Sequence, residues 1–267
     1  MKKNFTDADT ENYYNTVEIK YQVPWNPDGS KHWGYFDNLD APDHEEELFQ
    51  ASDRWNEYML NQSKICCKSR VLDVGCGNGN TAIYLGNETN CEVVGIDISQ
   101  THVNNAQKKA AGFPDLNLSF KKASATNLVF SDGYFTHVWS QGTLLHIHER
   151  ELTLREFYRL LNKSGILIFD DLVTLVSQVT DSTLKYVYER MQISQLFSPN
   201  DYKNYLEKAG FTILDSLDLS PHMKKFYGIQ AKRFQKEFPE RSIAYEKTRD
   251  AVNNGEIGWW FYLCQKS

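Results

Sequence analysis

The 267-residue chain lacks the features that assign many proteins to a class at once. No apolar run approaches the roughly 20 residues that a membrane-spanning helix needs, which excludes a spanning protein. The cysteines are odd in number and scattered, and none has a CxxC or Cys/His spacing, so we expect neither a disulfide framework nor a bound metal. The five are Cys66, Cys67, Cys76, Cys91 and Cys264.

The chain also lacks a surplus of positive charge. Its net charge is −6 and its pI is about 5.7, with acidic and basic residues interspersed. Proteins that bind nucleic-acid backbones usually carry a basic stripe, so we expect no nucleic-acid partner. No apolar stretch follows Met1-Lys2-Lys3. We therefore expect no secretory signal, and a cytosolic address without a membrane partner.

What the sequence does contain is an alternation of short apolar runs with amphipathic stretches between residues 70 and 169. Leu154, Phe157, Tyr158 and Leu161 recur with the spacing of a helix that buries one face. Strands that alternate with helices favour an α/β fold with a mainly parallel sheet. The five strands expected here are Arg70–Val74, Glu92–Ile96, Leu116–Phe120, Tyr134–Trp139 and Gly165–Phe169.

Further elements are expected on both sides of that region. Ser198-Pro199-Asn200-Asp201 supplies an N-cap, a proline and an acid at the start of a helix that Gly210 would end. Another helix is expected around residues 44–63, and Asn26-Pro27-Asp28-Gly29 is typical of a turn. The remaining elements are strands at Phe211–Leu214 and Trp259–Cys264, with a helical segment at His222–Asn254 between them.

The most informative segment is Val71-Leu72-Asp73-Val74-Gly75-Cys76-Gly77-Asn78-Gly79, in which a buried strand runs into three alternate glycines and then a helix. Glycine permits positive φ and lets a ligand approach the backbone, and a helix start offers free N–H groups. A glycine-rich turn also serves plain strand-to-helix packing. The segment therefore indicates a ligand site only together with a second signal.

That second signal is Asp97, at the end of the second strand. An acid at this position can accept hydrogen bonds from both hydroxyls of a ribose. Either Asp97 or Ser99 could cap the following helix, near Thr101–Ala111. We expect Ser99 to do so and to leave Asp97 free for a ligand. Together the two signals indicate a cofactor that contains a nucleoside.

Two nucleoside cofactors fit the glycines in different registers. The dinucleotide pattern G-x-G-x-x-G/A matches Gly77, Gly79 and Ala82, which would make the chain an NAD-dependent dehydrogenase but leaves Asp73 unexplained. The in-register pattern D-x-G-x-G-x-G resembles motif I of the class I S-adenosylmethionine-dependent methyltransferases. That resemblance implies a Rossmann-like sheet of seven strands with helices on both faces. It also implies S-adenosylmethionine as the cofactor, with S-adenosylhomocysteine as its product.

The resemblance, which extends over residues 70–171, implies roles for the residues of the glycine-rich segment. Gly75, Gly77 and Gly79 would approach the methionine part of the cofactor, with Asp73 near its charged amino-acid end. Asp97 would hold the ribose.

The same resemblance implies further contacts along the sheet edge. The adenine is expected against Ile98 and beside Ser124 and Ala125. The family usually has an aspartate where Ser124 stands, and a serine accepts a hydrogen bond without carrying charge. Ser140 and Gln141, after the fourth strand, are expected to contact the cofactor. Gln141 could instead orient the methyl acceptor.

Shorter motifs outside that region are similar to those of the methyltransferases that act on sarcosine and dimethylglycine, and of their relatives that act on phosphoethanolamine. They include Tyr13-Tyr14-Asn15, His32–Phe36 and Gly258–Tyr262. The phosphoethanolamine enzymes place a catalytic histidine at the position of His146, paired with a tyrosine that Tyr14 matches best. The resemblance therefore implies that His146 and Tyr14 are catalytic. The alternative is that both residues serve packing and backbone contacts alone.

Aromatic residues are the candidates for the acceptor pocket. An aromatic wall stabilises a methylated ammonium by cation–π attraction, on the order of 1–2 kcal/mol per contact when desolvated. Aromatic residues more often belong to the plain core, which is the alternative for each of them. The candidates are Tyr13, Trp33, Tyr35, Tyr227 and Trp260.

These expectations combine into a single methyltransferase domain over residues 1–267. An N-terminal lid and helix would occupy residues 1–69, the cofactor-binding core residues 70–171, and the rest of the sheet with a helical substrate-side insertion residues 172–267. The expected reaction is methyl transfer to a small molecule, with N-methylation of an amine as the main hypothesis. The alternatives are C- or O-methylation of a natural product, the dehydrogenase, and a cofactor-binding scaffold without catalysis.

Overall fold

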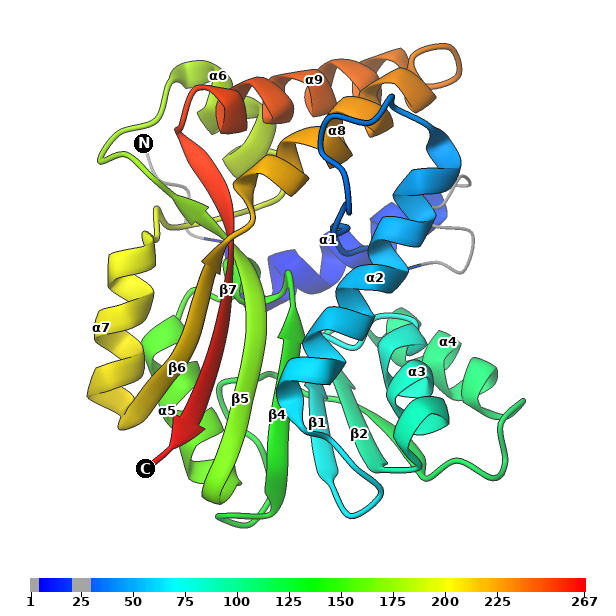
Figure 1. Cartoon of the computed structure of the whole chain (residues 1–267), viewed down its shortest axis with the longest axis vertical. Helices are drawn as coiled ribbons and strands as arrows, with labels where there is room; N and C mark the ends of the chain where they lie inside the picture. Colours follow the sequence, from blue (N-terminus) through cyan, green and yellow to red (C-terminus); the bar gives the residue numbers. More distant parts are fainter. Residues whose placement is uncertain (1–4, 21–29) are drawn as a thin grey trace.

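A seven-stranded sheet is the framework of the computed structural model, in which residues 5–20 and 30–267 are described. The strand order is β3-β2-β1-β4-β5-β7-β6 (Figure 1). The turn expected at Asn26–Gly29 lies outside the described residues. The strands are β1 Arg70–Val74, β2 Glu92–Asp97, β3 Leu118–Lys122, β4 Phe135–Gln141, β5 Leu161–Thr174, β6 Phe211–Asp218 and β7 Ile257–Lys266.

The sheet is mainly parallel, as expected from the alternation of strands and helices. β1 pairs in parallel with β2 and β4, and β2 with β3 and β4 with β5 do the same. Only β7 runs antiparallel, between β5 and β6. The carboxyl ends of the six other strands therefore lie along one edge, where open α/β sheets bind ligands.

Helices cover both faces of this sheet, because the buried strands are apolar on both sides. Val71 of β1 packs in one hydrophobic cluster with residues of α2 and α3, whereas Leu72 and Val74 pack in a second cluster with residues of α5 and α7. The helices are α1 Asp7–Lys20, α2 Glu45–Ser63, α3 Asn80–Thr89, α4 Gln100–Ala110, α5 Arg150–Leu160, α6 Asp181–Thr183, α7 Pro199–Ala209, α8 Ser220–Phe234 and α9 Pro239–Asn253, with a 3-10 turn η1 at Leu144–His146 and a π-helical segment η2 at Leu184–Glu189.

A helical cap lies beyond the carboxyl edge of the sheet. The helices α8 and α9 pack together there with α6 and η2 (Figure 1), and α1 lies next to the arrowheads of the parallel strands. The insertion between β6 and β7 was expected as one helical segment, but Pro239 separates it into two helices because proline at the start of a helix cannot continue the preceding one.

Most element boundaries follow signals in the sequence. Ser198 and Asp201 form the expected reciprocal capping box, and Gly210 ends α7 with a φ of 104°. Two elements were not expected: α1, which lacks an apolar stripe, and the α6–η2 insertion after β5. β5 is also longer than the expected Gly165–Phe169, since it continues into the cap beside β7.

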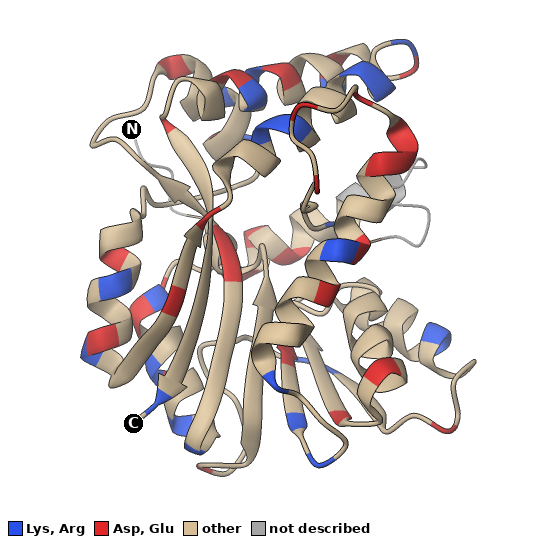
Figure 2. Cartoon of the chain, viewed as in Figure 1, with Lys and Arg blue, Asp and Glu red and all other residues tan. Residues whose placement is uncertain are grey.

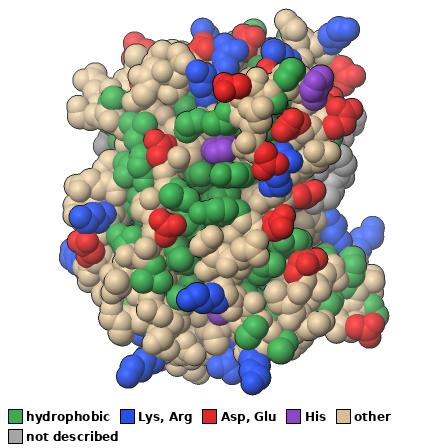
Figure 3. All heavy atoms as spheres, viewed as in Figure 1, with side chains coloured by type: hydrophobic (Ala, Val, Ile, Leu, Met, Phe, Trp, Pro, Cys, Tyr) green, Lys and Arg blue, Asp and Glu red, His purple; other side chains and the backbone are tan. Residues whose placement is uncertain are grey.

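On the face shown in Figures 2 and 3, charges of both signs occur on the described residues. Acidic and basic residues are interspersed along the helices (Figure 2), and hydrophobic side chains gather over the middle of the face in Figure 3, with charged ones mostly around its margin. Within residues 5–20 and 30–267, no helix is long and apolar enough to span a bilayer. The same residues contain no cluster of His, Cys, Asp and Glu that could hold a metal ion.

Candidate functional site

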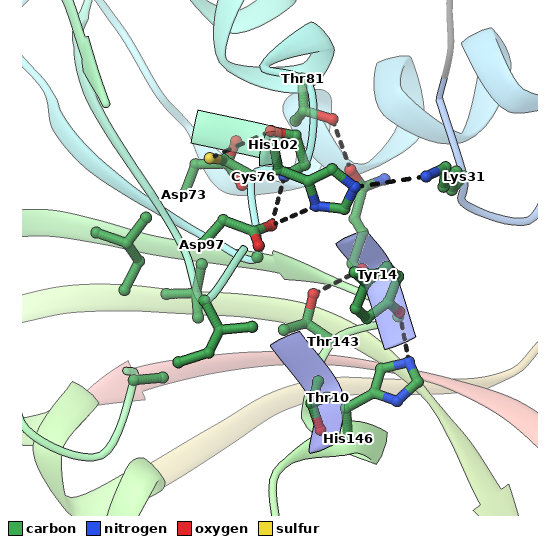
Figure 4. Close-up of a pocket in the computed structure, with 18 of the residues that line it drawn as sticks. Thr10, Tyr14, Lys31, Asp73, Cys76, Thr81, Asp97, His102, Thr143 and His146 are labelled. Atoms are coloured by element: carbon green, nitrogen blue, oxygen red, sulfur yellow. Dashed lines mark hydrogen bonds and ion pairs between the residues drawn. The ribbon is translucent and has the colours of Figure 1, made fainter. Parts of the chain in front are cut away.

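A pocket opens at the carboxyl edge of the sheet, between the ends of β1, β2 and β4 and the inner face of α1 (Figure 4). It contains the glycine-rich turn at one end and His146 at another. The strand order explains its position, because β1 sits where the connections of the sheet change direction. Its lining includes Asp73, Gly75, Gly77, Asp97, Ile98, Ser124, Ala125, Gln141, Gly142, Thr143 and His146, together with Asp7, Thr10 and Tyr14 of α1.

The three alternate glycines have different surroundings. All have positive φ: 74° at Gly75, 51° at Gly77 and 81° at Gly79. A Cβ at Gly75 would overlap the side chain of Thr143, whereas a Cβ at Gly77 would project into open space. Gly77 therefore leaves its backbone accessible to a ligand. Gly79 caps α3 and is not among the pocket-lining residues described, so its role is helix packing.

Asp73 presents an incompletely paired carboxylate to the pocket. The residue is only 3% exposed, and its Oδ2 has no hydrogen-bond partner among the described residues. Burial, and then the charge of Asp97, raise the pKa of Asp73 to about 7. A cation placed here would restore the ionised form and remove the cost of the buried oxygen.

Asp97 is held by the protein on both of its oxygens. Oδ2 accepts the N–H of Gly77 at 2.9 Å, and Oδ1 accepts the N–H of Ser99 at 2.8 Å. Ser99 caps α4 as expected, with its hydroxyl accepting the N–H of His102. Asp97 was expected to be left free for a ligand; it lines the pocket, but its carboxylate also ties the glycine turn to the start of α4. Its remaining lone pairs are what a ribose would use.

His102 and Lys31 extend this arrangement toward the N-terminal segment, and neither was expected from the sequence. Nδ1 of His102 lies 3.3 Å from Oδ2 of Asp97, and Nε2 lies 3.4 Å from Nζ of Lys31. His102 is almost fully buried. Its position on the first turn of the helix after Asp97 was the only signal that could have indicated the contact.

The part of the pocket beyond Asp97, where an adenine is expected, is apolar except for the hydroxyl of Ser124. Ile98 and Ala125 line it together with Ser124. The hydroxyl of Ser124 lies 2.9 Å from that of Thr126. Ser124 thus offers a neutral hydroxyl where the family that the sequence resembles usually has an aspartate.

Two neighbouring residues of β4 differ in their access to the pocket. Gln141 lines it, but its amide is already bonded: Oε1 accepts from Thr81 and Trp139, and Nε2 donates to Asn56. Ser140 is buried and donates to the carbonyl of Val74 at 3.2 Å. It is absent from the described lining, because alternate residues of a strand face opposite sides. The expected contact of Ser140 with a cofactor is therefore not supported.

Tyr14 and His146 meet across the pocket although they come from opposite parts of the fold. The hydroxyl of Tyr14, on α1, lies 2.6 Å from Nε2 of His146, on η1 (Figure 4). Burial, and then the charge of Arg150, lower the pKa of His146 to about 3. Burial is also the main cause that raises the pKa of Tyr14 well above 10. The imidazole is thus neutral at pH 7, and in the tautomer protonated at Nδ1 the tyrosine hydroxyl donates to Nε2.

The aromatic candidates do not form a single wall. Tyr13 packs edge-on against Tyr14, with ring centroids 5.1 Å apart, and lies 6.3 Å from the ring of His146. Trp33 lies behind the pocket, where its ring packs beside Gly142 and against Trp259.

The other three candidates lie farther from the pocket. Tyr35 stacks on His222 at 4.2 Å, Tyr227 is fully buried in the cap, and Trp260 donates to Ser216 near the opposite face of the sheet. None of the five candidates is in the described lining, so their contact with an acceptor stays a prediction. Their spacing along the chain contained no information about which side of each element they face.

The inner face of α1 was missed because it is polar. Asp7, Thr10 and Tyr14 follow a spacing of three and four residues and all line the pocket. Thr10 is 8% exposed, and its hydroxyl has no partner among the described residues. A helix that turns a polar face inward indicates contact with a ligand rather than with an apolar core.

Comparisons with known proteins agree with this geometry. The family described as a methyltransferase domain matches residues 72–169. The chain is 28% identical over 221 residues to the sarcosine/dimethylglycine N-methyltransferase of Halorhodospira halochloris, covering 81% of this chain and 76% of that one. It is 26% identical over 206 residues to an O-methyltransferase of Pyrenophora dematioidea, covering 77% and 76%.

A solved structure shows the same fold at low identity. The geranyl diphosphate C-methyltransferase of Streptomyces coelicolor A3(2), crystallised with Mg2+, geranyl diphosphate and S-adenosyl-L-homocysteine, matches with a TM-score of 0.82 at 14% identity, covering 99% of this chain and 100% of that one. Similar proteins thus include nitrogen, oxygen and carbon methyltransferases.

Proposed function

Because this chain is an S-adenosylmethionine-dependent methyltransferase, we propose that it methylates the nitrogen of a small amine, with Tyr14 and His146 handling the proton. The observation that carries the proposal is the 2.6 Å contact between the Tyr14 hydroxyl and Nε2 of His146 inside the pocket. Similarity to an enzyme named for sarcosine and dimethylglycine supports nitrogen as the acceptor atom. The dehydrogenase alternative has no support, since the matching family is a methyltransferase domain.

The pocket fits the cofactor at both ends. The unpaired Oδ2 of Asp73 suits the ammonium of the amino-acid end, and Gly77 leaves room for a ligand against the backbone. Asp97 would accept from the ribose, while Ile98 and Ala125 would flank the adenine and Ser124 would meet its polar edge. When bound, S-adenosylmethionine supplies an electrophilic methyl group on a sulfonium, whose thioether leaving group needs no acid.

The protein's part in the reaction is to orient the acceptor, exclude water and move one proton. An amine must be neutral to attack, so an ammonium acceptor first gives its proton to the oxygen of Tyr14. The hydroxyl proton of Tyr14 moves to Nε2 of His146 at the same time. Because burial lowers the pKa of His146 to about 3, this transfer from an ammonium is uphill, and the reaction proceeds only if the imidazolium gives up the proton again.

A second candidate is O-methylation, in which the same two residues would take the proton of an acceptor hydroxyl. A neutral imidazole that accepts a hydrogen bond from Tyr14 can take a hydroxyl proton as the oxygen attacks. Similarity to an O-methyltransferase supports this alternative. It uses the same two residues and differs only in the acceptor atom.

The proposal is tested by a screen with S-adenosylmethionine that carries a tritiated methyl group. The acceptors are glycine, sarcosine, dimethylglycine, phosphoethanolamine and a panel of phenols, with Tyr14→Phe as the matched control. Label transferred to an amine by the wild type is the expected result. Transfer only to phenols would replace it by the second candidate. Binding of NAD without binding of S-adenosylmethionine in calorimetry would contradict both.

A further inference from the structure

The turn that carries His146 is held by a buried arginine outside the pocket. Arg150 is the first residue of α5 and is 2% exposed. Its Nε donates to the carbonyl of Leu144 and its Nη2 to the carbonyl of Leu145, both at 2.8 Å. These are the two residues that precede His146 in η1. The fork of the guanidinium thus fixes two consecutive peptide planes of the turn.

A buried carboxylate also holds the same turn, through the backbone N–H of Leu145. Oδ1 of Asp171, near the end of β5, accepts the N–H of Leu145 at 3.0 Å. Its Oδ2 accepts the hydroxyl of Tyr202 at 2.5 Å. Both the N–H and the carbonyl of Leu145 are therefore bound by charged side chains that belong to different elements.

This arrangement is costly, which indicates a role beyond packing. A helix start attracts negative charge, so a buried cation there is unfavourable by itself, and the nearby carboxylate of Asp171 offsets this cost. Nη1 of Arg150 also has no hydrogen-bond partner among the described residues, although its guanidinium lies 4.6 Å from the ring centre of Phe197. Arg155 and Arg159, on the same helix, are instead partly exposed and paired with acids.

We propose that Arg150 and Asp171 are positioning residues that hold the η1 turn so that Nε2 of His146 faces the hydroxyl of Tyr14. The inference rests on the proposed function, because it assigns a purpose to that pair. Neither residue lines the described pocket, so they act through the backbone of residues 144 and 145 and not on the ligand.

The charge of Arg150 also acts on His146, in addition to its hydrogen bonds to the η1 turn. The groups that face His146 are Tyr13 and Tyr14 of α1, Asp97 of β2, Arg150 of α5 and the backbone of Met191. Arg150 lowers the pKa of the imidazole, whereas Met191 and Asp97 raise it. Loss of the guanidinium would therefore loosen the turn and also make His146 easier to protonate.

The test uses the full chain and needs no acceptor. In nitrogen-15 NMR of the imidazole at pH 7, the wild type should show one neutral tautomer, with Nε2 unprotonated. Arg150→Met should give averaged nitrogen signals and a higher pKa, with the Kd for S-adenosylhomocysteine changed less than twofold. Arg155→Met, on the exposed side of the same helix, is the matched control and should resemble the wild type.

A second variant keeps the inference testable if Arg150→Met does not fold. Tyr202→Phe removes only the hydroxyl that holds Asp171, and a smaller shift in the same direction is expected. Once an acceptor is known, kcat of the arginine variant should fall at least tenfold with little change in KM for the cofactor. An unchanged imidazole spectrum in either folded variant would overturn the inference. A wild type without methyl transfer would instead count against the proposed function and leave the spectra interpretable.

Discussion

The hydroxyl of Tyr14 lies 2.6 Å from Nε2 of His146, although 132 positions separate the two residues. One comes from the N-terminal helix and the other from the turn after β4. Their contact places a neutral imidazole and a protonated tyrosine at the edge of a pocket that contains the glycine-rich turn. The contact also requires α1 to lie over the sheet edge, so the helix that lines the pocket is the one that supplies Tyr14.

The buried carboxyl of Asp73 predicts that cofactor affinity depends on pH. Its pKa is raised to about 7 without a ligand, and the ammonium of a bound cofactor would lower it. Binding therefore releases a proton, and affinity should increase as the pH rises from roughly 5.5 to 7, by up to about tenfold per pH unit. Calorimetry with S-adenosylhomocysteine measures this slope. Asp73→Asn should bind more weakly with a flat profile, and the same slope in that variant would assign the proton to another group.

Replacing Asp97 should weaken cofactor binding through both the ribose and the glycine turn. Asp97→Ala removes the acceptor for Gly77 and Ser99 as well as the expected ribose contacts. At about 1.5–3 kcal/mol per hydrogen bond to a charged group, the Kd for S-adenosylhomocysteine should rise at least about 100-fold. Asp97→Asn retains one acceptor oxygen, so its Kd should lie between those of the wild type and Asp97→Ala. An affinity within twofold of the wild type in Asp97→Ala would mean that the ribose lies elsewhere.

Asp170 predicts a specific effect of two tryptophans on stability. Its two oxygens accept the indole N–H groups of Trp55 on α2, at 2.8 Å, and Trp259 on β7, at 2.9 Å. Trp55→Phe leaves a buried oxygen without its donor, so the free energy of unfolding in urea should fall by about 1–3 kcal/mol. Trp260→Phe, which removes a bond to Ser216 in an exposed region, should cost less than about 0.5 kcal/mol.

The loss of stability in Trp55→Phe should also depend on pH, in a direction that the pKa of Asp170 sets. Burial raises the pKa of Asp170 to about 7, above its unfolded value, so its ionisation costs stability as the pH rises toward and through 7. Loss of the Trp55 donor disfavours the ionised form further. The destabilisation in Trp55→Phe should therefore be larger at pH 8 than at pH 6. Equal losses at both values would show that the N–H group does not stabilise the charge.

The framework of the site could be predicted because it follows local rules. The glycines, the cap at Ser99 and the acid at the end of β2 are set by short stretches of sequence, and the structure places them together. The prediction that Ser140 contacts the cofactor did not take into account that side chains alternate along a strand. Ser140 shares the face of β4 with Val138, opposite Trp139, so strand alternation alone was enough to separate it from Gln141.

The residues that could not be predicted depend on how distant elements pack. Tyr35 belongs to the motif His32–Phe36 and Tyr227 lies in α8, and the packing of α2 and α8 turns both away from the pocket. Lys31 reaches His102 only because the N-terminal segment crosses the sheet edge. No spacing along the chain contains that information, since it arises from tertiary contacts between residues about 70 positions apart.

Whether Tyr14 and His146 act as one unit in methyl transfer is tested most directly by a double-mutant cycle. Tyr14→Phe, His146→Gln and the double variant are compared with the wild type for kcat on the acceptor found in the screen, and for the Kd of S-adenosylhomocysteine. Each single variant should lose about 100-fold or more in kcat, within the range typical of general base catalysis, and the double variant should lose little more than either. Kd should change less than threefold in all of them. Losses in kcat that multiply, or a wild-type rate in either single variant, would contradict a shared role.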